Sequence, residues 1–121
     1  MSIKERLLKL PEEIEAKKFE VMAKQKDLAT CREQLRFWEL YELSSISNEI
    51  DDNGKPKYSN DTKRQAELQH RKDQSEDFGA MEDTVKKLDL EVSVLNIKLD
   101  TLSNEQSNLR AICRLESDSN D

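Results

Sequence analysis

Apolar residues recur at alternating spacings of three and four along the second half of the chain. One column contains Met81, Leu88, Leu95, Leu102 and Leu109, and the other contains Phe78, Val85, Val92, Leu99, Gln106 and Cys113. This heptad repeat places both columns on one narrow face of an α-helix, with charged residues between them. The pattern is typical of a coiled coil and predicts a second helix over residues 61–116.

The first half carries a similar repeat with two polar interruptions. One column contains Leu7, Ile14, Val21, Leu28 and Leu35, and the other contains Ile3, Leu10, Cys31 and Trp38, interrupted by Lys17 and Lys24. This repeat predicts a first helix over residues 3–49. We expect a kink or a restart near Pro11, because proline removes a backbone donor inside a helix.

Residues 50–60 separate the two repeats and contain Asn53-Gly54 and Lys55-Pro56, which supply the positive and fixed φ angles of turns. Ser59 or Asn60 suits the N-cap of the second helix. We therefore predict an all-α fold: one long antiparallel helical hairpin over residues 1–121, with a frayed acidic tail at 117–121. One continuous rod that dimerises in parallel is the less favoured alternative.

A second apolar stripe lies outside this hairpin seam. Two helices cannot bury all of Phe37, Leu40 and Leu43 on the first helix and Leu90, Val94 and Ile97 on the second. Such stripes usually pack against further helices. We expect Leu90, Val94 and Ile97 to form a homo-oligomer surface, giving a dimer or tetramer of hairpins arranged as a four-helix bundle.

The composition argues against catalysis. Only 35% of the residues are hydrophobic and 38% are charged, which is too little apolar material for a sizeable globular core. Nucleophilic catalysis needs a base held beside a nucleophile in a water-excluding pocket. His70 is the only histidine and lies in a polar stretch. We expect no enzyme activity, no cofactor and no bound metal.

The same sequence predicts a cytoplasmic protein without a membrane partner. No stretch approaches the roughly 20 apolar residues of a membrane span, and the amino-terminal residues lack the apolar run of a secretory signal. Cys31 and Cys113 are too far apart in sequence for a zinc knuckle, and we expect both to be small buried hydrophobes.

Aromatic and basic residues gather toward the predicted turn. Residues 50–72 hold six basic against four acidic residues, although the whole chain has a net charge of -6. The candidate partner-binding residues are Phe37, Trp38, Tyr41, Lys55, Lys57, Tyr58, Lys63 and Arg64. We favour an aromatic plug and a solvated loop over a protein anchor or a nucleic-acid site.

The segment Asn53-Gly54-Lys55, followed by Tyr58-Ser59-Asn60 and Lys63-Arg64, resembles small coiled-coil proteins of bacteriophage and prophage genomes. Such proteins often carry two glutamates where Asp61 and Thr62 stand here. They are mostly of unknown function, so the resemblance implies a phage setting and the host cytoplasm.

Our leading hypothesis is a homo-oligomeric adaptor that binds an unidentified protein of the host or of the phage DNA-handling machinery. The first alternative is a nucleic-acid accessory protein that binds through the basic hairpin tip. The second alternative is a chaperone-like or structural coiled coil. Binding lost with Trp38 would favour the adaptor, and salt-sensitive DNA binding lost with Lys55, Lys57, Lys63 and Arg64 would favour the first alternative.

Overall fold

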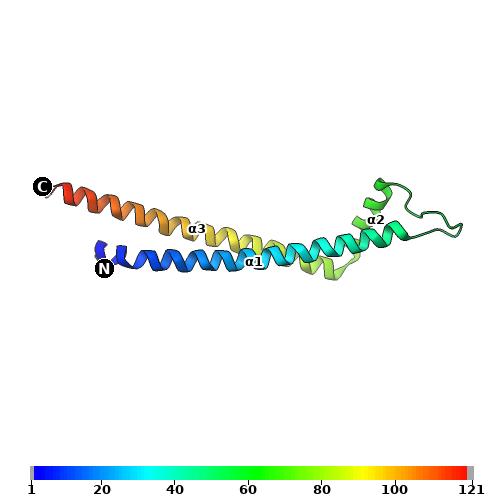
Figure 1. Ribbon diagram of the computed structural model, residues 1–121, viewed down its shortest axis with the longest axis horizontal. Helices are drawn as coiled ribbons and strands as arrows, with labels where there is room; N and C mark the ends of the chain where they lie inside the picture. Colours follow the sequence, from blue (N-terminus) through cyan, green and yellow to red (C-terminus); the bar gives the residue numbers. More distant parts are fainter. Residues whose placement is uncertain (1, 120–121) are drawn as a thin grey trace. The chain divides into compact units, whose positions relative to one another are not determined.

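The computed structural model describes residues 2–119 and contains three α-helices in this range (Figure 1). They are α1 (Ile3–Asn48), α2 (Asp61–Gln74) and α3 (Glu76–Ser119). Lys24 contacts Glu91, whereas the earlier residue Arg6 contacts the later residue Glu105, so α1 and α3 run antiparallel. The predicted all-α helical hairpin is confirmed.

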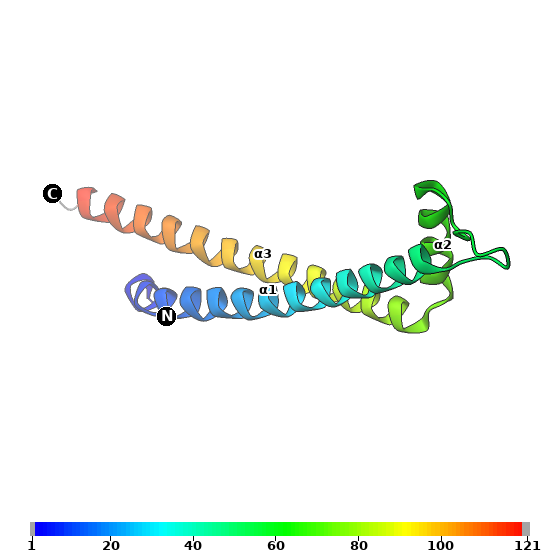
Figure 2. The same ribbon diagram turned by 45° about the vertical axis from the view of Figure 1, so that its right-hand side comes forward.

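The chain divides into two compact units. Unit 1 comprises Met1–Lys26 and Leu88–Asp121, and unit 2 comprises Asp27–Lys87. Each unit contains part of α1 and part of α3, while the turn and α2 belong to unit 2 (Figure 2). The single domain over residues 1–121 stays a prediction.

The predicted seam forms the core of both units. Every residue of the four apolar columns, including the two interrupting lysines, is buried or half-buried. In unit 1 the buried residues include Leu10, Ile14, Val21 and Val92, and in unit 2 they include Leu28, Ile46, Leu68 and Phe78. The heptad repeat therefore identifies the packed face of both long helices.

The polar positions of the seam are stabilised by ion pairs in unit 1. The Lys24 ammonium lies 2.9 Å from a carboxylate oxygen of Glu91 on α3. The Lys17 ammonium turns to Glu20 in its own helix, at 3.3 Å. Both lysines keep their aliphatic stems along the seam while their charges reach carboxylates at its edge.

The helix boundaries differ from expectation in two places. α1 is continuous across Pro11, so it does not restart there, while the kink stays a prediction. The predicted helix 61–116 is interrupted at Ser75, whose backbone is extended (φ -92°, ψ 113°). Its amide donates to the Lys72 carbonyl at the end of α2, and its hydroxyl accepts from the Phe78 amide at 3.0 Å, so one residue ends α2 and begins α3.

The end of α3 and the start of α2 lie close to their predicted positions. α3 continues to Ser119, so residues 117–119 are helical where we expect fraying, and residues 120–121 lie outside the described range. Asn60 is the N-cap of α2, and its side-chain oxygen accepts a hydrogen bond from the Lys63 amide at 2.9 Å. That cap is one of the two predicted from the sequence.

The loop between α1 and α2 is held by a tight turn. The Asp51 carboxylate accepts hydrogen bonds from the amides of Asn53 (2.9 Å) and Lys55 (3.0 Å), and Gly54 has a φ of +75°. An isolated bridge joins Ile50 to Pro56. The Asn-Gly and Lys-Pro pairs therefore act in the turn as predicted, because only glycine adopts positive φ without strain.

Candidate protein-binding surfaces

A groove of about 500 Å³ lies between α1 and α3 in unit 1. Its lining residues on α1 are Glu13, Ala16, Lys17 and Glu20, and those on α3 are Ile97, Lys98, Thr101 and Leu102. Ile97 is 65% exposed although it is fully apolar. Ala16 has a side chain too small to fill the space beside it. The groove thus combines an apolar floor with charged edges.

Ion pairs fix the charges beside the groove. Arg6 hydrogen-bonds Glu105 on α3 and, at 2.8 Å, Glu13 on α1. Hydrogen bonds from Arg6 hold the pKa of both carboxyls below its usual range, and the same bonds raise the pKa of the Arg6 guanidinium. Glu13 therefore stays ionised at neutral pH and is suited to recognition rather than to proton transfer.

The predicted oligomer stripe is exposed on α3. Leu90 is 66%, Val94 42% and Ile97 65% exposed. Their spacing of four and three places the three side chains on one face of the helix. Of the three, only Ile97 lines the groove. The stripe therefore continues the apolar surface of the groove along α3.

The aromatic residues of α1 in unit 2 divide into two groups. Trp38 is half-buried and its ring packs on that of Phe78, with centroids 4.6 Å apart. Phe37 is 60% and Tyr41 74% exposed, with Leu40 between them at 51%. Trp38 is thus part of the packing of unit 2, and the exposed aromatic patch consists of Phe37, Leu40 and Tyr41.

The basic tip is partly neutralised. Lys57, Tyr58 and Lys63 line a shallow cavity of about 450 Å³ together with Glu67. The Lys57 ammonium lies 5.6 Å from the centroid of the Tyr58 ring. Arg64 pairs with Asp61 at 2.9 Å and also donates to the Tyr58 carbonyl, while Lys55 is exposed in the turn.

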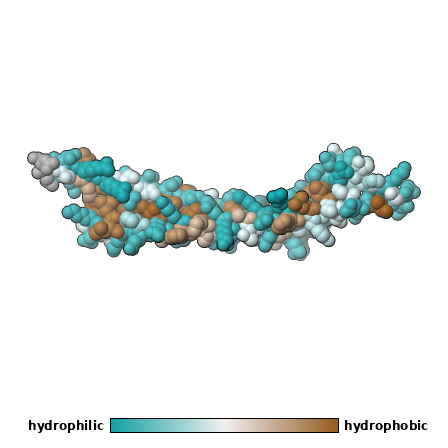
Figure 3. Space-filling model, viewed as in Figure 1, coloured by the Kyte–Doolittle hydropathy of each residue, from teal (hydrophilic) through white to brown (hydrophobic). Residues whose placement is uncertain are grey.

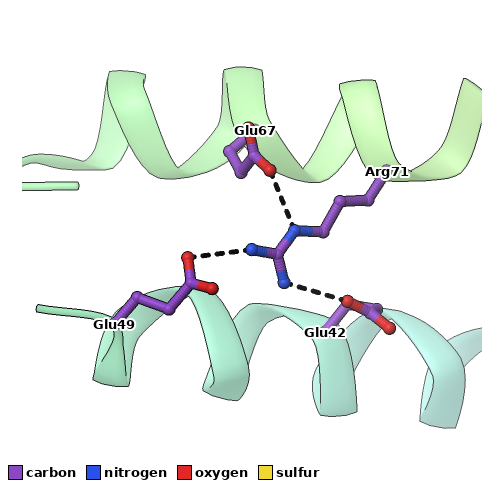
Figure 4. A network of polar contacts seen from close by, with 4 residues as sticks. All are labelled: Glu42, Glu49, Glu67 and Arg71. Atoms are coloured by element: carbon purple, nitrogen blue, oxygen red, sulfur yellow. Dashed lines mark hydrogen bonds and ion pairs between the residues drawn. The ribbon is translucent and has the colours of Figure 1, made fainter. Parts of the chain in front are cut away.

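A network around Arg71 joins α2 to α1 in unit 2 (Figure 4). The guanidinium donates to Glu67 on α2 at 2.9 Å, to Glu42 on α1 at 3.2 Å, and to Glu49, the residue that follows α1, at 2.9 Å. The hydrogen bond from Arg71 lowers the pKa of the Glu67 carboxyl. This network positions α2 and the loop before it.

The sequence does not single out the groove residues Glu13, Ala16, Lys98 and Thr101. The sequence indicates the groove only through two residues: the small Ala16 beside the seam on α1, and the apolar Ile97 outside the seam on α3. Within residues 2–119, no group of three or more His, Cys, Asp or Glu side chains is arranged to hold a metal ion. Apolar side chains reach the surface over α1 and α3 (Figure 3).

None of the helices in the described range has the length and hydropathy needed to cross a membrane. Comparison of the chain with protein-family models, with curated proteins and with solved structures found no match.

Proposed function

We propose that this chain is a non-catalytic adaptor that holds an amphipathic helix of a partner protein in the groove of unit 1. The observation that carries the proposal is the groove itself, a concave space of about 500 Å³ in which Ile97 is 65% exposed. Apolar surface left open beside a completed seam is typical of protein-binding sites.

A helix fits this site better than an extended strand. The groove runs between two helices and presents side chains, so it offers no free backbone edge to a strand. Ala16 lets the backbone of a third helix approach closely, while Ile97 and Leu102 supply the apolar floor. A docked helix would place apolar residues at positions i, i+3, i+4 and i+7 on this floor.

The charged edges give the partner its orientation. Lys98 lines the groove on α3, whereas Glu13, Lys17 and Glu20 line it on α1, where Arg6 pairs with Glu13 and Lys17 pairs with Glu20. A partner helix with acidic residues on the flank that faces α3 would pair with Lys98, and this pairing would set its direction in the groove. Rim charges of this kind contribute more to specificity and association rate than to affinity.

Selection from a displayed library of helical peptides tests the proposal. Peptides that bind the wild-type chain should carry the apolar spacing above and should lose at least tenfold in affinity for Ile97→Asp, because a buried unpaired carboxylate costs more than about 1.4 kcal/mol. Leu115→Asp is the matched control, since Leu115 is equally exposed on α3 (69%) but lies outside the groove. Equal loss in both variants would contradict the assignment.

The biological setting is part of the proposal. The tip residues that resemble phage and prophage coiled-coil proteins support a phage origin, with a host or phage DNA-handling protein as the partner. Action in the host cytoplasm suits Cys31 and Cys113, which are free and half-buried. Self-association through Leu90, Val94 and Ile97 would compete with the partner for Ile97.

Nucleic-acid binding at the tip is the second candidate. Lys57 and Lys63 line the same cavity as the ring of Tyr58, and the Lys57 ammonium lies over that ring, an arrangement that suits a phosphate beside a stacked base. Because Glu67 lines the same cavity and Asp61 neutralises Arg64, we give it less weight. A Lys55→Glu, Lys57→Glu and Lys63→Glu variant should lose any salt-sensitive binding of single-stranded DNA, whereas Ile97→Asp should retain it.

A further inference from the structure

The outward face of α1 in unit 1 carries four residues in one line. Glu15, Phe19, Met22 and Lys26 are separated by four, three and four positions, a spacing that stacks side chains along one side of a helix. Phe19 is 57% and Met22 59% exposed, and Glu15 and Lys26 are also exposed. The seam residues of the same helix segment point to α3, so this line is a separate surface.

The four residues form a self-complementary pattern when two copies of the helix pack antiparallel. In an antiparallel pair of identical helices, residues whose numbers have a constant sum face one another. Phe19 with Met22 and Glu15 with Lys26 both sum to 41. Antiparallel docking of two copies would therefore join two Phe–Met contacts in the centre and flank them with two Glu–Lys pairs.

We propose that a second copy of this chain docks antiparallel on the face formed by Glu15, Phe19, Met22 and Lys26. A twofold interface uses the same patch on both subunits, so the patch must be self-complementary. An acidic residue, two apolar residues and a basic residue in this order meet that requirement. Parallel docking would oppose Glu15 to Glu15 and Lys26 to Lys26. A strongly charged partner is not favoured, because the face itself has no net charge.

This dimer leaves the groove open. The groove residues of α1 are Glu13, Ala16, Lys17 and Glu20, and none of them belongs to the docking face. The dimer would present two grooves, and a partner with two helices could bind both with increased avidity. The inference itself does not depend on what the groove binds.

Charge exchange in the full chain tests the interface by sedimentation equilibrium over a range of concentrations. Each single change, Glu15→Lys or Lys26→Glu, converts both symmetric pairs to like charges. Because two ion pairs are lost and replaced by repulsion, we expect dimerisation to weaken about tenfold or more. The double variant Glu15→Lys/Lys26→Glu recreates both pairs and should return to the wild-type dissociation constant.

Two matched controls lie beside the face. Glu12→Lys and Lys18→Glu make the same charge changes at exposed positions of the same segment, but their antiparallel partners in this register carry no charge. Both should dimerise like wild type, and circular dichroism should show equal helicity in all variants.

Three outcomes would overturn the proposal. The chain could be monomeric at every concentration, or the single changes could leave a dimer unaffected, as expected for parallel docking. Alternatively, Ile97→Asp could abolish the dimer while Glu15→Lys does not, which would place the second copy in the groove.

Discussion

The indole of Trp38 and the phenyl ring of Phe78 pack with centroids 4.6 Å apart and planes tilted by 44°, joining α1 to the first turns of α3 within unit 2. Offset, tilted ring pairs of this kind add stability beyond their buried area. The Lys72 ammonium lies over the Phe78 ring, 5.4 Å from its centroid. Trp38 therefore stabilises the fold, so its substitution should lower the stability of the protein and not only its binding of a partner.

Trp38→Ala should destabilise the protein by about 2 to 3 kcal/mol, somewhat less than the 3 to 5 kcal/mol typical of a fully buried aromatic residue. Urea denaturation followed by circular dichroism measures the change. Tyr41→Ala is the control, because Tyr41 is 74% exposed one turn away and should change stability by no more than about 0.5 kcal/mol. Equal effects would show that Trp38 is not packed on Phe78.

The heptad columns predict the packed face of α1 and α3 because burial along a helix depends on periodicity, which is local information. The break at Ser75 is not predicted, because Ser75 precedes Phe78, the first residue of the apolar columns, so the heptad repeat carries no signal there. Its signal was present in Ser75 followed by Glu76 and Asp77, the pattern of an N-cap with an acidic first turn.

The candidate sites were harder to predict. Trp38 belongs to a seam column and is half-buried, whereas Phe37 belongs to the second stripe and is exposed, so the heptad repeat separates two residues that the candidate partner-binding set groups together. The groove depends on residues from both ends of the sequence, Ala16 and Ile97, and neither has a distinctive motif. Pairing of Arg64 with Asp61 reduces the basic character that composition assigns to the tip.

Arg71→Met should destabilise the protein by about 1 to 2 kcal/mol, because it leaves Glu42, Glu49 and Glu67 close together without their shared cation. Thermal unfolding followed by circular dichroism measures the effect. Arg64→Met is a useful comparison: its partner Asp61 is 90% exposed, and the expected change is below about 0.5 kcal/mol. Similar losses of stability in the two variants would contradict the conclusion that the Arg71 network stabilises unit 2 more than an exposed ion pair does.

The same network predicts a pH dependence. The pKa of Glu67 is lower in the folded protein than in the unfolded chain, because Arg71 donates a hydrogen bond to its carboxylate. Its contribution is complete above the unfolded pKa of about 4.3 and is lost as the pH falls through the lower folded value. Wild type should therefore lose more stability than Arg71→Met between neutral and acidic pH. Parallel curves of melting temperature against pH would contradict this.

Asn60→Ala should destabilise the protein by about 1 kcal/mol, since it leaves the Lys63 amide at the start of α2 without its side-chain acceptor. Hydrogen exchange should show faster exchange of the amides in the first turn of α2 than in wild type. Asn60→Asp keeps an acceptor oxygen and should keep the slow exchange. Fast exchange in both variants would show that the side chain does not cap the helix.

Lys17→Leu should stabilise the protein by about 1 kcal/mol. Lys17 occupies a seam position between Leu10 and Lys24, its side chain is only 22% exposed, and its one ion pair is with the exposed Glu20 of the same helix. Leucine would continue the apolar column, and the gain from burial exceeds the small value of that exposed pair. Lys18→Leu places the same residue at an exposed neighbouring position and should change stability by less than about 0.5 kcal/mol. Stabilisation by Lys18→Leu instead would mean that α1 is rotated by one position against α3, so urea denaturation of this pair tests the register of unit 1 directly.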